Sequence, residues 1–149
     1  MIRNIKVDRP KKILFVDDNP HEHLFFKEAI KKLNIEFNLI FAWDGEEALK
    51  IITDMEILPD IMFLDLNMPK MDGFETLREL KMEGILNLLP IVLYTTSCLE
   101  SEICLAKEYG AWWFLKKPPL HLLPQALQSI LEQRDMSTVN AEIVLKKFR

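Results

Sequence analysis

Residues 11–20 read KKILFVDDNP, in which a short apolar run is followed by two acids, an asparagine and a proline. Such a run is typical of a strand buried on both faces of a parallel sheet. Asn19 can accept the free amide hydrogens of a first helical turn, and Pro20 suits the first helical position because it has no N–H group. The stretch therefore predicts a strand, an acidic turn and a helix in close succession.

The same alternation recurs along the chain. Further apolar runs lie at 37–41, 61–64, 91–94 and 112–115. The segments between them carry apolar residues at helical spacing, as at Phe26, Ala29, Ile30 and Leu33. Five such units with right-handed crossovers predict an α/β fold with a doubly wound, five-stranded parallel sheet. We expect the flavodoxin-like strand order 2-1-3-4-5.

Helix boundaries are marked by their own residue types. Asp44 and Glu47, like Asp72 and Glu75, have the spacing of a capping box at a helix start. Gly110 can end the fourth helix in the left-handed conformation.

Size and composition narrow the classes of function. We expect one ordinary core and no second folded domain, because the chain has 149 residues, 49% of them hydrophobic. The net charge of −4 gives no overall positive field for nucleic acid. No apolar segment reaches the ~18 residues that a membrane span needs. We therefore expect a cytoplasmic protein that binds neither nucleic acid nor membrane.

The cysteines and histidines carry no metal-site signal. Cys98 and Cys104 stand farther apart than the usual paired metal ligands, so we interpret them as reduced packing residues. His21 and His23 point to different faces of a helix, and we expect both to be exposed to solvent at its start.

Polar side chains follow the predicted strands at their carboxyl ends. Asp17 and Asp18 follow the first run, and Asp65 follows the third. In the expected strand order these ends are neighbours where the winding direction reverses, which is where such sheets bind ligands. Three converging carboxylates repel one another and need a cation, and their oxygens suit Mg²⁺. Thr95 and Lys117 follow the fourth and fifth runs, and can offset the charge on a phosphoryl group attacked by a carboxylate.

Four motifs resemble the receiver domains of two-component response regulators, in the family's order and at its spacing. They are FVDDNP at 15–20, FLDLNMPKMDG at 63–73, VLYTTS at 92–97 and GAWWFLKKP at 110–118. One such motif alone is a weak signal, whereas four in register over one α/β domain are highly specific.

The resemblance implies the roles of the acidic residues. Asp65 would be the phosphoacceptor. Asp17, Asp18 and Asp65 would hold Mg²⁺, together with the backbone carbonyl of Asn67. The phosphoryl donor would be a sensor histidine kinase or a histidine phosphotransfer protein.

The resemblance also implies a switch. Thr95 would contact the phosphoryl oxygens, and Lys117 would pair with the phosphoaspartate. Phe114 stands at the position of the aromatic residue that acts as a switch in the family. Because it lies in an apolar run, it could equally be an ordinary core residue. The bond from Lys117 to Pro118 resembles the family's cis peptide bond. Phosphorylation would change a partner-binding surface formed by the fourth helix, fifth strand and fifth helix.

We therefore expect a stand-alone receiver, a phosphoacceptor signalling protein with an unidentified downstream protein target. It would not be an enzyme, apart from catalysing its own phosphorylation and dephosphorylation. The sequence leaves open whether it passes the phosphoryl group on or docks on a target, and whether it forms a homodimer.

Two other functions fit parts of the pattern. One is a Mg²⁺-dependent phosphohydrolase with Asp65 as nucleophile, which is disfavoured because the sequence has no capping domain to enclose a substrate. The other is a receiver-like scaffold that works without phosphorylation, which would not need the polar site residues.

The ends of the chain fall outside the repeating pattern. We expect an N-terminal extension at 1–10, a receiver domain at 11–134 and a tail at 135–149. The tail has an apolar stripe, which is compatible with an extra amphipathic helix and consists of Ala141, Val144, Leu145 and Phe148.

Overall fold

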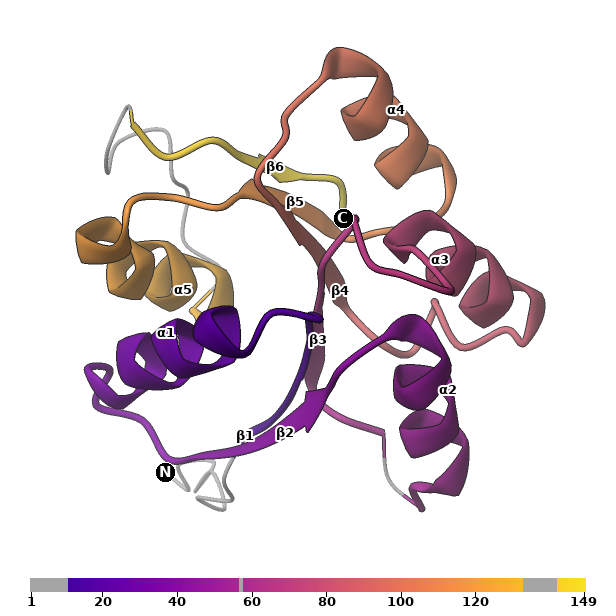
Figure 1. The fold of residues 1–149 in the computed structure, drawn as a ribbon, viewed down its shortest axis with the longest axis horizontal. Coiled ribbons are helices and arrows are strands. Elements are labelled where there is room, and N and C mark those ends of the chain that lie inside the picture. Colours follow the sequence, from indigo (N-terminus) through magenta and orange to yellow (C-terminus); the bar gives the residue numbers. More distant parts are fainter. Residues whose placement is uncertain (1–10, 57, 133–141) are drawn as a thin grey trace, which may run out of the picture.

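The computed structural model describes residues 11–56, 58–132 and 142–149. Within them one six-stranded sheet has the order β2-β1-β3-β4-β5-β6, with helices on both faces (Figure 1). The strands are β1 (Lys11–Val16), β2 (Phe37–Ala42), β3 (Ile61–Leu64), β4 (Ile91–Thr95), β5 (Trp113–Lys116) and β6 (Leu145–Lys147). Strands β1 to β5 are parallel, which confirms the predicted fold class and the order 2-1-3-4-5.

Three of the helices begin at the predicted caps. The helices are α1 (Pro20–Lys31), α2 (Gly45–Asp54), α3 (Gly73–Met82), α4 (Glu100–Glu108) and α5 (Leu123–Leu131), with a 3-10 turn η1 (Leu120–Leu122) before α5. The side chain of Asn19 caps α1, that of Asp44 caps α2, and Asp72 forms a capping box with Glu75 at α3. None of the helices in the described part of the chain is long and apolar enough to cross a membrane.

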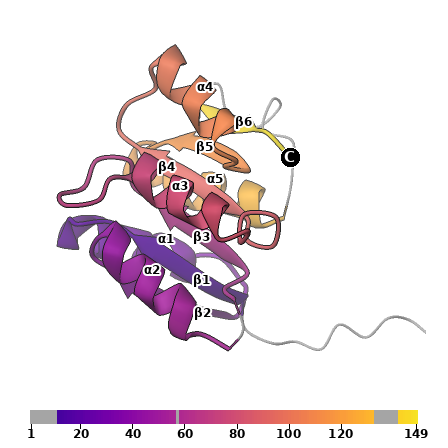
Figure 2. The ribbon, with the colours of Figure 1, turned by 90° about the vertical axis from the view of Figure 1, so that its right-hand side faces the viewer.

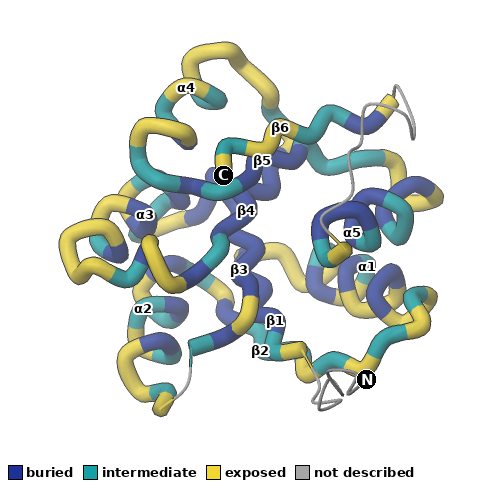
Figure 3. The backbone as a smooth tube through the Cα atoms, turned by 180° about the vertical axis from the view of Figure 1, so that it is seen from behind, coloured by how far each residue is buried: buried dark blue, intermediate teal, exposed yellow. Residues whose placement is uncertain are grey.

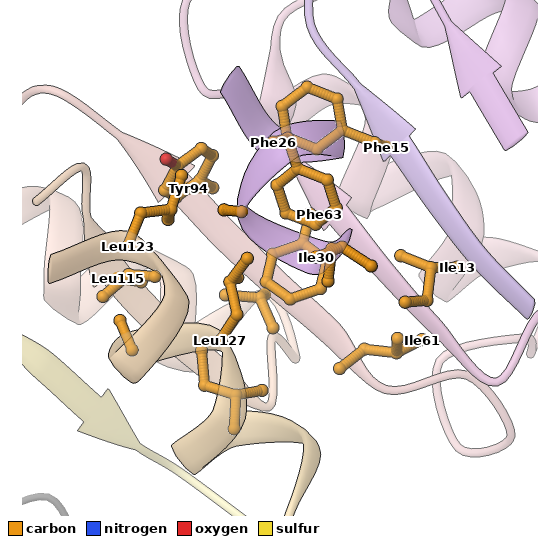
Figure 4. Packing of buried hydrophobic residues seen from close by; sticks show 14 of the residues in the cluster. Ile13, Phe15, Phe26, Ile30, Ile61, Phe63, Tyr94, Leu115, Leu123 and Leu127 are labelled. Carbon is orange, nitrogen blue, oxygen red and sulfur yellow. The ribbon is translucent and has the colours of Figure 1, made fainter. Parts of the chain in front are cut away.

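The sheet separates two hydrophobic cores. Helices α1 and α5 cover one face, where Phe15 and Phe26 stack with ring centroids 4.2 Å apart and Phe63 packs beside them (Figure 4). Helices α2, α3 and α4 lie in front of the other face (Figure 2). The central strands are buried on both sides (Figure 3), and each buried Phe contributes roughly 2–3 kcal/mol to stability. This packing holds the carboxyl ends of the strands in fixed positions.

The tail forms a strand, so the predicted helix over the apolar stripe is wrong for its described part. β6 pairs antiparallel with β5, with Leu145 opposite Leu115 and Lys147 opposite Trp113. Without β6, the backbone N–H and C=O groups on the outer edge of β5 would have no strand partner. Hydrogen bonding to this edge favours a strand over the helix that the apolar spacing of the tail predicts. Lys147 also lies 5.2 Å from the centroid of the Trp113 ring. Ala141 lies outside the described residues.

We expect the tail to stabilise the domain through Ile143, which is buried in the core beneath α5. Ile143→Ala should lower the free energy of unfolding by about 2–4 kcal/mol, because it leaves a cavity. The neighbouring Val144→Ala is the control, since Val144 is only partly buried and its backbone carbonyl still accepts from Lys116. Urea unfolding followed by tryptophan fluorescence measures both. Equal, small losses in the two variants would show that the tail is not part of the cooperative core.

Candidate functional site

The predicted site residues come together at the carboxyl edge of the sheet. Asp17 and Asp18 follow β1, and Asp65 follows β3, the neighbouring strand. The backbone amide of Asp65 donates to the carbonyl of Val16 at 2.9 Å, which ties the two acidic turns together. Thr95 ends β4 and Lys117 follows β5, and the Lys117 amide donates to the Thr95 carbonyl at 2.6 Å.

The three acids form a compact cluster. One carboxylate oxygen from each of Asp17, Asp18 and Asp65 lies within 4.8 Å of the others. Asp17 and Asp65 are buried, whereas Asp18 is exposed. Three carboxylate ligands, one of them exposed to solvent, suit a hard divalent cation that also binds water. These residues therefore fit the Mg²⁺ ion that the sequence predicts.

The positively charged side chain of Lys117 lies among these acids. Its Nζ donates a hydrogen bond to Asp17 Oδ2 at 2.9 Å and lies 3.6 Å from Asp65 Oδ1. It also lies 3.6 Å from Glu22 Oε2, in the first turn of α1. Burial alone would lower the pKa of Lys117, but the hydrogen bond to Asp17 and the charges of the acids outweigh it and raise that pKa above its ordinary value. Lys117 is therefore held as a charged ammonium.

Glu22 is a member of the site that the sequence analysis did not identify. Its position in the first turn of a helix that starts directly after Asp18 was the available signal, because that turn must lie near the strand ends. The carboxylate adds to the negative field, and burial together with the charges of Glu22, Asp17 and Asp65 raises the pKa of the Tyr94 hydroxyl.

Asp65 has an unusual proton affinity. Burial and then the charge of Asp17 raise its pKa from 3.8 to about 7, against the opposing effect of Lys117. Its backbone is crowded as well, because a Cβ atom at Gly73 would stand 2.6 Å from the Asp65 carbonyl oxygen. Only glycine fits there, and it lets α3 start directly beneath the phosphoacceptor candidate.

The pKa of Asp65 predicts a pH dependence of stability. The Asp65 carboxyl keeps its proton to a higher pH in the folded protein than in the unfolded chain. The stabilisation that protonated Asp65 gives to the fold is therefore fully present below pH 3.8 and is lost as the pH rises through about 7. The loss is about 4 kcal/mol at most, and about 2 kcal/mol once solvent screening is discounted. In chelator, the free energy of unfolding should fall between pH 5 and pH 8, and Asp65→Asn should reduce that slope. Identical slopes for the two proteins would show that Asp65 titrates normally.

The remaining predicted residues are placed around this cluster. Thr95 is fully buried, and its Oγ1 accepts a hydrogen bond from the Ser97 amide at 3.4 Å. Phe114 is fully buried in the core shared with α2, α3 and α4. Asn67 is exposed on the loop after β3. The described residues contain no cis peptide bond, so the expected cis bond before Pro118 is absent.

Two predictions about side-chain exposure are wrong. His23 is buried rather than exposed, because its ring packs against residues of β1 and β2 and donates to a backbone carbonyl, whereas His21 is exposed as predicted. Cys98 and Cys104 are both exposed rather than packed, because Cys98 lies in the loop before α4 and α4 itself buries only Ala106.

Comparison with known protein sequences identifies relatives. The sequence profile of the response regulator receiver domain matches residues 13–128. Rcp1 of Synechocystis sp. is 33% identical over 113 residues, covering 72% of this chain and 77% of Rcp1. The transcriptional regulatory protein CpxR of Klebsiella pneumoniae is 37% identical over 108 residues, which cover 72% of this chain but only 43% of CpxR.

Solved structures give the same result. The phosphorylated cyanobacterial phytochrome response regulator RcpA superposes with a TM-score of 0.74 at 29% identity, covering 89% of this chain and 98% of RcpA. The Mn²⁺-bound form of Rcp1 superposes with a TM-score of 0.73 at 32% identity, covering 88% of this chain and 98% of that one. The resemblance seen in the four sequence motifs is thereby confirmed, while the exact domain limits 11–134 stay a prediction. The chain belongs to the response regulator receiver domain family.

Proposed function

We propose that Asp65 is the residue that accepts the phosphoryl group in this signalling protein. Receiver domains accept phosphoryl groups from histidine kinases and act on downstream targets. The observation that carries the assignment is the position of Asp65, a buried carboxylate beside Lys117 and two further acids at the reversal point of the sheet. Its donor would be a sensor histidine kinase or a histidine phosphotransfer protein, and the protein would act in the cytoplasm beside that partner.

Asp17, Asp18 and Asp65 would hold Mg²⁺, with the backbone carbonyl of Asn67 as a further ligand. The all-oxygen cluster favours a hard cation, and the similar protein Rcp1 has been crystallised with Mn²⁺. When bound, the ion offsets the negative charge of the carboxylates and of the phosphoryl oxygens.

The transfer step follows from the residues around Asp65. A carboxylate oxygen of Asp65 forms a bond to phosphorus while the bond from phosphorus to the donor's imidazole nitrogen breaks, and the imidazole keeps that electron pair. Lys117 supports the transfer because its ammonium lies 3.6 Å from Asp65 and can stabilise the added charge. The Thr95 hydroxyl can donate to a phosphoryl oxygen, because its oxygen accepts from the Ser97 amide and no residue in the described part of the chain accepts its hydrogen.

The output would pass from Thr95 to Phe114. Thr95 begins the loop that leads to α4, where Ser97 bonds to Glu102 in the first turn of that helix. Movement of Thr95 toward a phosphoryl group would pull this loop and change the packing of Phe114 beneath α4. The surface of α4, β5 and α5 would then bind its target differently.

Incubation with Mg²⁺ and acetyl phosphate tests the proposal. Intact-mass spectrometry should show the gain of one phosphoryl group, sensitive to hydroxylamine and prevented by chelator. A phosphohydrolase would instead turn over a free phosphomonoester repeatedly, and a phosphorylation-independent scaffold would take up no phosphoryl group at all.

A further inference from the structure

His23 lies against the acidic turn with only 4% of its surface exposed. Its Nε2 atom is 2.6 Å from the backbone carbonyl oxygen of Asp17. Since a carbonyl oxygen only accepts hydrogen bonds, Nε2 must carry the hydrogen and donate it. This bond joins the first turn of α1 to the peptide that links Asp17 to Asp18.

The other polar groups of Asp17 are held by separate partners. Its amide donates to the Ala42 carbonyl at 3.2 Å, Oδ1 accepts from the Asn19 amide at 2.9 Å, and Oδ2 accepts from Lys117 at 2.9 Å. The bond from His23 is the one that fixes the carbonyl. It therefore holds the plane of the peptide that joins the two acids.

The surroundings of the His23 ring show that packing alone does not explain why a histidine occupies this buried position. The ring stacks on Trp43 with centroids 4.0 Å apart and meets the edge of Phe15 at 5.2 Å. Its Nδ1 is buried and has no hydrogen-bond partner among the described residues. An apolar side chain would fill the same space without burying an unpaired polar atom. The bond from Nε2 is the contribution that an apolar residue could not make.

We infer that His23 is a positioning residue for the metal and phosphoryl site. Its Nε2–H group holds the peptide between Asp17 and Asp18 so that both carboxylates face Asp65, while Trp43 covers the ring from the outside. This inference rests on the proposed function, because the acids need this alignment only to hold a cation beside Asp65. Residues outside the ligand set that orient ligands in this way commonly strengthen metal binding by about 10-fold or more.

Three variants test this role. His23→Leu keeps apolar packing but removes the donor, whereas His23→Gln offers an amide N–H that can reach the same carbonyl. His21→Leu is the matched control on the exposed side of the same turn. Calorimetry should show Mg²⁺ affinity weakened about 10-fold in His23→Leu, within about 3-fold of wild type in His23→Gln, and unchanged in His21→Leu.

Nuclear magnetic resonance supplies a readout that needs no metal. The amide of Asp18 belongs to the peptide that His23 holds, so its signal should shift in metal-free His23→Leu and stay in place in His21→Leu. Long-range ¹⁵N–¹H spectra of the wild type should place the ring hydrogen on Nε2. A hydrogen on Nδ1 alone overturns the inference even if the leucine variant fails to fold.

The remaining outcomes separate the two proposals. Folded His23→Leu that binds Mg²⁺ like wild type overturns the inference and leaves the proposed function intact. Equal losses in His23→Leu and His23→Gln also overturn it, because they assign His23 to packing. Failure of the wild type to bind Mg²⁺ contradicts the proposed function, and the inference falls with it.

Discussion

The Asp65→Asn protein is expected to keep its unmodified mass after incubation with Mg²⁺ and acetyl phosphate. The amide of asparagine carries no negative charge and is a far weaker nucleophile, so the bond to phosphorus does not form. The loss of phosphorylation should be complete, because the Asp17 carboxylate is held by Lys117 and Asn19, and Lys117 pairs with Asp17 and Asp65 rather than with Asp18.

This loss should not result from misfolding. Asp65 is buried beside Asp17, which disfavours its charged form, so replacing it with a neutral side chain removes a repulsion in the metal-free protein. The melting temperature of Asp65→Asn in chelator should equal or exceed that of wild type near pH 8. Asp54→Asn is the control, because it makes the same charge change at the exposed end of α2. Phosphoryl uptake by Asp65→Asn at the wild-type level would refute the assignment of the phosphoacceptor.

Replacing Lys117 with methionine should impair both chemistry and stability. The rate of phosphorylation should fall about 100-fold or more, because the variant lacks the ammonium that stabilises charge on the transferred group. In chelator at pH 8, the free energy of unfolding should drop by about 3 kcal/mol, because buried Asp17 and Asp65 lose their cation. Stopped-flow phosphorylation and urea unfolding measure the two effects.

Magnesium should restore much of the stability lost in Lys117→Met, since the ion replaces the missing positive charge beside the same acids. Lys116→Met removes one charge from the neighbouring residue and serves as the control. If Lys117→Met were phosphorylated as fast as the Lys116→Met control, Lys117 would have no part in the transfer.

The strands and the acidic cluster could be predicted because local signals mark them. β3 is four consecutive buried residues, so its apolar run in the sequence has no polar interruption, and Asp65 follows at once. Asp17 and Asp18 follow β1 in the same way, and the strand order of the α/β fold then brings these turns together. The strands and the acids that follow them can be read from adjacent residues, and the meeting of the acids follows from the usual connections of an α/β fold.

What could not be predicted depends on contacts between distant segments. β6 becomes a strand because β5 offers it an edge, which the apolar spacing of the tail does not reveal. His23 is buried because Phe41 and Trp43, at the end of β2, close over it. The place of Glu22 near the strand ends could be inferred from its position after Asp18, but its ion pair with Lys117, which follows β5, could not.

Trapping with borohydride identifies the residue that carries the phosphoryl group. The phosphorylated protein is reduced, which converts an aspartyl phosphate to homoserine, and peptides are then sequenced by mass spectrometry. Homoserine should appear at position 65 and only in samples that received both Mg²⁺ and acetyl phosphate. Homoserine at position 17 or 18, or unmodified Asp65 in protein that carries a phosphoryl group, would contradict the account.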